Sequence, residues 1–134
     1  MQKDFILREI EKIVYSITRL VGLKNAANPE AFIQHADQFL QDEYDLKLPE
    51  LLELSIEDFD LLLDERNYSA DKLDALAQLL HMYYEPFVAN DETLAALQKI
   101  ISIFNRLEKD HHRTSFENIN KRNAIYQFLQ NNYE

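Results

Sequence analysis

A single glycine, Gly22, occurs in the whole 134-residue chain. Two-residue β-hairpin turns depend on glycine or Asn-Gly pairs, because their backbone needs positive φ angles. No Asn-Gly pair is present, and no stretch alternates apolar and polar residues with the period of two that is typical of a strand. Apolar residues recur instead every three to four positions, as in amphipathic helices. We therefore predict an all-α protein with a helix content of about 70% or more, well above the level typical of globular proteins.

The length suits a single domain spanning residues 1–134, and an apolar fraction of 46% is enough to close a core. We expect five to seven helices, mostly antiparallel. They cover about residues 3–21, 29–44, 49–54, 56–66, 70–85, 92–110 and 116–133. The residues expected at their ends are Gly22, the pair Asn28-Pro29, Ser55, Asn67, Ser69, Pro86, Asn90 or Asp91, and Thr114 or Ser115.

Charge is spread unevenly over the chain, whose net charge is −10. Residues 25–98 contain three Lys/Arg and seventeen Asp/Glu, whereas residues 1–24 and 99–134 each have two more basic than acidic residues. A general nucleic-acid binder needs a basic face, so this distribution argues against that class of partner. No cysteine is present, which excludes disulfides, thiolate metal sites and a cysteine nucleophile. No uninterrupted apolar run indicates a signal peptide or a membrane span, so we expect a cytoplasmic protein.

Two adjacent histidines, His111 and His112, stand among carboxylates and are the first candidates for a metal or catalytic site. Adjacent residues on a helix point about 100° apart, so the two rings cannot easily share one ion. The apolar stripe of the preceding helix stops at this point, and a helix cap follows. We therefore interpret the pair as an exposed turn between two helices, with a weak metal site as the alternative. His35 and His81 are each alone on the polar edge of a helix, so we expect surface or packing roles for them.

Acidic residues gather on the predicted helix at 56–66, where Asp60 and Asp64 are neighbours at positions i and i+4. A divalent ion between them is the alternative to a solvated acidic face, which we favour because no glycine-containing calcium loop is present. Motifs for phosphate loops, dinucleotides and serine nucleophiles need glycines that the chain lacks. We therefore name no catalytic, cofactor-binding or metal-ligating residue and expect no cofactor.

The first helix carries the sharper signal. Arg8, Lys12 and Arg19 fall within about 40° of one another on a helical projection, with Tyr15 beside them. This basic strip can meet an acidic partner, a phosphate backbone or an anionic membrane surface. The interpretation that we favour from the sequence is an ordinary polar face that contacts water or the acidic middle of the same chain.

The apolar side of the same helix spans about 140°, wider than the ~100° stripe of an ordinary surface helix. Such a face is hard to cover completely in a chain this short, and an uncovered remainder marks an interaction site. We expect a homodimer or another protein partner to bind there, with Leu7 and Val14 as contacts.

Three short stretches resemble a family of short, uncharacterised bacterial helical proteins, catalogued as a domain of unknown function. They are the opening Met1-x-Lys3-Asp4-Phe5-Ile6-x-Arg8-x-Ile10-Glu11, the LAQLL sequence at Leu76–Leu80, and Ser115-Phe116-Glu117. The second half is also loosely similar to tetratricopeptide helical hairpins. Counted from Ala70, residues Ala77, Ala89 and Ala96 occupy small-residue positions of that repeat, whereas Thr93 and Ile101 depart from it. The resemblance implies stacked antiparallel helices in the second half and carries over no activity.

The function that we expect from these features is a non-catalytic protein-interaction or scaffolding module. The alternative is a helical metal-dependent hydrolase, or another enzyme, that uses the acidic and histidine residues of the middle and C-terminal helices.

Overall fold

The computed structural model describes residues 2–133, and side chains from Lys3 onward. Over this range the chain is 84% helical and contains seven α-helices, one π-helical turn and no strand. The prediction of an all-α fold is confirmed. The chain divides into two compact units, Met1–Leu48 and Pro49–Glu134. We describe each unit by itself, and the expectation of one domain stays a prediction.

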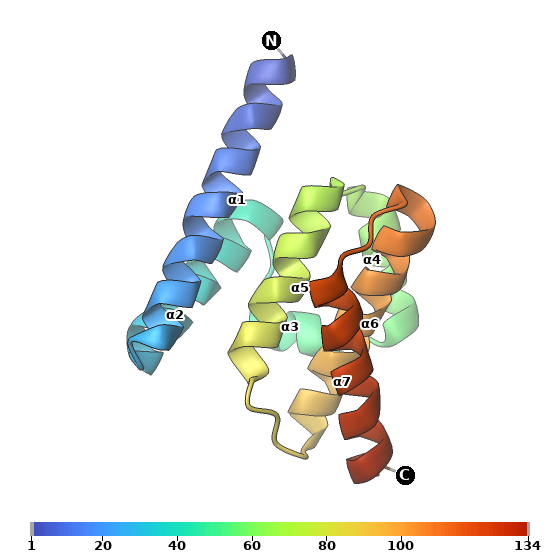
Figure 1. Ribbon diagram of the computed structural model, residues 1–134. Coiled ribbons are helices and arrows are strands. Elements are labelled where there is room, and N and C mark those ends of the chain that lie inside the picture. Colours follow the sequence, from blue (N-terminus) through green and yellow to red (C-terminus); the bar gives the residue numbers. More distant parts are fainter. Residues whose placement is uncertain (1, 134) are drawn as a thin grey trace. The chain divides into compact units, whose positions relative to one another are not determined.

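The first unit is an antiparallel pair of helices. It comprises α1 (Gln2–Asn25), α2 (Pro29–Phe39) and a π-helical turn, η1 (Leu40–Tyr44), that continues α2 (Figure 1). Asn28 caps α2 by accepting a hydrogen bond from the backbone N–H of Ala31, and Pro29 takes the first helical position. Since α1 is the longer element, its N-terminal half extends past the end of α2 in Figure 1.

The prediction that Gly22 ends the first helix is wrong. The helix continues for another three residues to Asn25, and the left-handed backbone conformation that reverses the chain falls on Ala27, with φ 54°. Asn28 must be non-helical because a proline follows it, so the reversal is placed directly before that residue. Gly22 is a helical position with no side chain of the protein near its missing Cβ.

The second unit contains five helices. Its element order is α3 (Leu48–Glu53), which starts at the unit boundary, α4 (Ile56–Arg66), α5 (Ala70–Tyr84), α6 (Asp91–His111) and α7 (Phe116–Tyr133). The hydroxyl or amide oxygens of Ser55, Ser69, Asn90 and Ser115 each accept the backbone N–H three residues ahead. These four residues are among the predicted caps, and the left-handed Asn67 ends α4 as expected.

The core of this unit lies between α5 and α6, which form an antiparallel hairpin (Figure 1). Eight residues of each helix are buried, and α4 and α7 pack against other sides of α6. The broad apolar face of α6 is covered because this helix has several neighbours.

The last helix differs from its prediction at one position. The apolar pattern of the sequence predicts that both Ile125 and Tyr126 face inward, but only Ile125 is buried and Tyr126 is 46% exposed. Adjacent residues on a helix point about 100° apart, and α7 contacts the rest of the unit along a narrow strip that includes only one of the two.

Candidate functional site

Helices α4 and α6 are joined by a polar network. Arg106 donates hydrogen bonds to Asp64 Oδ1 at 2.6 Å and to the backbone carbonyl of Asp60 at 3.1 Å. Ser102 Oγ donates to Asp60 Oδ1 at 2.5 Å. Asp110 lies 3.7 Å from the same guanidinium. The expectation of a solvated acidic face therefore needs a correction at Asp60, which is half-buried against α6. Asp64 pairs with Arg106 but stays exposed, as expected.

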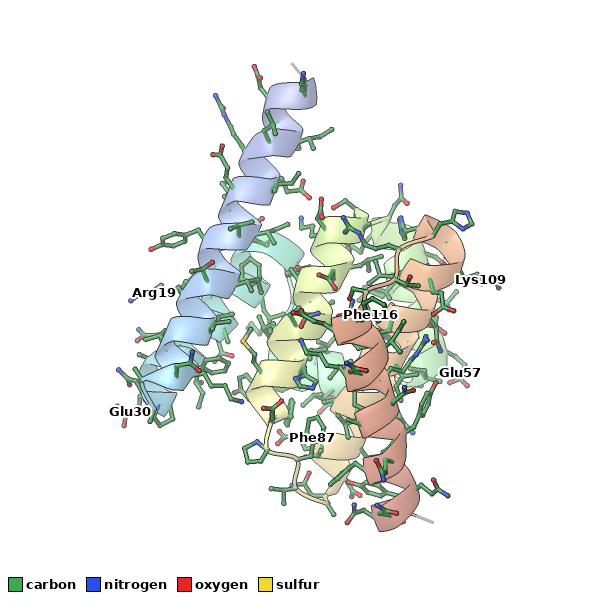
Figure 2. The ribbon with its side chains drawn as sticks, viewed as in Figure 1. Arg19, Glu30, Glu57, Phe87, Lys109 and Phe116 are labelled. Carbon is green, nitrogen blue, oxygen red and sulfur yellow. The ribbon has the colours of Figure 1, made fainter. Side chains whose placement is uncertain are left out.

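Beside this network the surface is hollowed into an open groove of about 560 Å³. It is lined by Ile56, Asp60, Asp64, Gln98, Ile101, Ser102, Asn105, Arg106, Lys109 and Asp110. Its volume falls in the range of small-molecule sites. The charged groups nearest α4, however, already form hydrogen bonds and ion pairs with one another. Their role is therefore to join the two helices. Lys109, which projects from α6 in Figure 2, makes no hydrogen bond or ion pair among the described residues.

Lys99 is buried on the inner side of α6. Its ammonium donates a hydrogen bond of 2.7 Å to the carbonyl of Leu54 and one of 3.4 Å to the carbonyl of Leu52, at the C-terminal end of α3. It also lies 5.8 Å from the centre of the Phe59 ring. Burial lowers the pKa of Lys99 from its usual 10.5. The side chain satisfies helix-end carbonyls and does not line the groove, so its role is structural.

Lys99 was not among the functional residues predicted from the sequence. The one available signal was its position beside the apolar arc of α6, where a lysine stem can be covered while the ammonium reaches a neighbouring helix end.

The adjacent histidines lie where the turn was predicted. His111 is the last residue of α6, and His112 caps it in the left-handed conformation with φ 51°; both are exposed. Among the described residues, no group of three or more histidine, aspartate or glutamate side chains is arranged to hold a metal ion.

We expect the double variant His111→Asn/His112→Asn to change the free energy of unfolding by no more than about 0.5 kcal/mol, the usual range for surface positions. Asparagine tolerates the left-handed conformation of His112, so the cap should persist. Thermal unfolding of both proteins measures the difference. Stoichiometric zinc in untagged wild-type protein, absent from the variant, would show that the pair binds metal.

The other two histidines take the packing role, one of the two roles expected for them. His81 is buried, with its ring edge-on to Phe87 and its Nδ1 3.3 Å from Glu85. His35 is half-buried and bonds to the backbone of Ser16; burial, followed by the nearby charge of Arg19, lowers its pKa below 6.5. Both are packing residues.

The apolar side of α1 is only partly covered. Ile13 and Leu20 are buried, and Ile10 and Ile17 are half-buried. The two predicted contacts remain accessible, with exposed fractions of 49% for Leu7 and 57% for Val14.

The predicted basic strip is also accessible. Arg8, Lys12 and Arg19 are exposed, and none makes a hydrogen bond or ion pair among the described residues. Figure 2 shows Arg19 extending outward from α1. The strip is continuous with two exposed aromatic residues, Phe5 and Tyr15, so one ridge of α1 carries five residues without an acid.

No protein-family model, curated protein or solved structure matches this chain. None of the described helices is both long enough and apolar enough to cross a membrane.

Proposed function

We propose that this protein is a non-catalytic protein-interaction module and that α1 carries its binding surface. The observation that supports this most directly is the pair of uncovered faces on one helix. Leu7 and Val14 expose apolar area on one face, and unpaired basic side chains occupy the other. Burying an exposed Leu or Val side chain fully is worth about 1.5–3 kcal/mol, whereas a basic strip mainly favours encounter with an acidic partner.

The test is capture of a binding protein by immobilised wild type and by the variant Leu7→Asp/Val14→Asp. A charge at each contact should lower recovery at least tenfold, because even half of that burial energy, lost at two positions, amounts to about 1.5–3 kcal/mol. Leu61→Asp is the matched control, since Leu61 is 63% exposed on α4, in the other unit. Equal losses in the two variants, or none in either, would contradict the proposal.

The alternative function is a metal-dependent hydrolase, or another enzyme, that uses acidic and histidine residues of the middle and C-terminal helices. Its site would be placed at the α4–α6 groove. Only the size of the groove and the three aspartates among its lining residues favour it. Metal-dependent thermal stabilisation of wild type that Asp64→Asn abolishes would support this alternative.

Three further expectations belong to the same proposal. We infer a cytoplasmic location, a bacterial source from the resemblance of the opening residues, and tetratricopeptide-like stacking from the small residues of α5 and α6. We also keep the expectation that nucleic acid is not a partner, because residues 25–98 are strongly acidic.

A further inference from the structure

Five apolar residues of α1 form a stripe with coiled-coil spacing. Leu7, Ile10, Val14, Ile17 and Val21 follow one another at intervals of three, four, three and four residues. At 100° per residue they lie within an arc of about 80°. We call this set the α1 seam.

The α1 seam is distinct from the part of α1 that packs inside the first unit. The buried residues Ile13 and Leu20 lie at one edge of it, on the side that α2 covers. Val21 is 43% exposed, and with Leu7 and Val14 it forms the uncovered row of the seam. The helix therefore has two neighbouring apolar stripes, of which its own unit fills one.

From this arrangement we infer that the α1 seam pairs with the α1 seam of a second copy of the chain, in antiparallel orientation. The inference rests on the proposed function and names the partner. Heptad spacing is typical of a helix that packs along a second helix. Two copies of this seam match each other when the helices run in opposite directions. When two copies run in opposite directions, Ile10 lies opposite Val21 of the second copy and Val14 opposite its Ile17. Each contact occurs twice about the twofold axis.

Charged residues select the orientation. Lys3 and Lys24 both continue the spacing of the seam. In a parallel pair, Lys3 would therefore face Lys3 of the second copy and Lys24 would face Lys24, which brings like charges together. The antiparallel pair instead places each Lys24 opposite Leu7, at the end of the seam, where its stem can cover the leucine. The macrodipoles of the two helices also oppose one another in this arrangement.

The residues beside the seam favour one register of the antiparallel pair. Asp4, Glu11 and Thr18 run along the side of the seam that lies away from α2. In the register described, Glu11 lies beside Thr18 of the second copy. Sliding the pair by one heptad would bring Glu11 beside Glu11 of the second copy, which like-charge repulsion disfavours.

The size of the contact sets the expected affinity. The seam from Leu7 to Lys24 is about 25 Å long at 1.5 Å per residue. It offers five apolar residues, whereas a standard interface has about 20–30 residues on each side. We therefore expect a dimer with a dissociation constant in the micromolar range.

The absence of cysteine allows a direct test of the pairing. Ile10→Cys and Val21→Cys are made separately, mixed in equal amounts at about tenfold the measured dissociation constant, and oxidised briefly. The intact masses of the products then identify which chains are linked. Disulfides need Cα atoms about 4.4–6.8 Å apart, so the antiparallel pair should give the mixed Ile10→Cys/Val21→Cys product at least tenfold over either homodimer.

Lys12→Cys is the control, because position 12 lies on the opposite side of α1 and should not link. Circular dichroism of each variant confirms that it is folded. Disulfide dimers of Ile10→Cys alone and of Val21→Cys alone would show a parallel pair and overturn the inference. So would cross-linking no greater than that of Lys12→Cys. If that result accompanies binding of another protein that Leu7→Asp/Val14→Asp abolishes, self-pairing fails while the proposed function stands.

Discussion

Replacing Lys99 with alanine is expected to lower the free energy of unfolding by about 2–3 kcal/mol. The substitution removes a buried side chain and leaves the carbonyls of Leu52 and Leu54 without their donor. The substitution also removes the free-energy cost of burying a charge, which offsets part of the loss in stability. Urea unfolding followed by circular dichroism measures the change. A loss below about 0.5 kcal/mol would show that the contact between α3 and α6 does not depend on this lysine.

Lys99→Met is the matched control, because methionine keeps the unbranched stem and lacks the charge. Burial lowers the pKa of Lys99 below the 10.5 of the unfolded chain, so the unfolded state binds the proton more tightly. The stability of the wild type should therefore rise relative to Lys99→Met as pH increases from the lowered pKa towards 10.5. A constant difference in stability between neutral pH and pH 10.5 would show that burial does not lower the pKa of Lys99.

Replacing Ile125 with alanine is expected to cost about 3 kcal/mol and to loosen α7. Ile125 is the buried residue of α7 among those described, and loss of such a side chain leaves a cavity. The other contacts of α7 are made by residues that are more exposed to solvent. They include a ring contact of 5.5 Å between Phe87 and Phe128 and a hydrogen bond of 2.7 Å from the Tyr133 hydroxyl to the carbonyl of Asn90.

Tyr126→Ala is the control for this prediction, because Tyr126 is the exposed neighbour of Ile125. It should cost less than about 1 kcal/mol. Hydrogen exchange should quicken in α7 for Ile125→Ala and stay unchanged for Tyr126→Ala. Similar effects of the two variants would show that α7 is held mainly by its polar contacts to α5, which join Gln78 to Asn118 and Lys121.

The local features of the fold could be predicted from the sequence because they depend on neighbours along the chain. Ser55, Ser69 and Asn90 cap helices through bonds that span only three residues, and Pro29 fixes a helix start by its own ring. Gly22 was misjudged because glycine permits a helix end without requiring one, and the Asn28-Pro29 pair placed the chain reversal later.

The contacts between helices could not be predicted in the same way. Asp60 and Asp64 were recognised as neighbours, but their partners Ser102 and Arg106 are more than forty residues away in sequence. Helical periodicity shows that Lys99 lies beside an apolar face, yet only the position of α3 shows what its ammonium binds. On α1, periodicity identified both accessible faces, because little of the first unit covers that helix.

The measurement that tests the central claim most directly is the mass of the protein in solution, determined by light scattering from 1 to 300 μM. If α1 is an association surface that pairs with itself, wild type should approach twice the 15.9 kDa chain mass as concentration rises. Leu7→Asp/Val14→Asp should remain at the monomer mass with unchanged helicity, and Leu61→Asp should behave as wild type. A double variant that loses its fold would show that these residues belong to the core of the protein. A mass that the double variant does not change would show that the protein does not associate through this face.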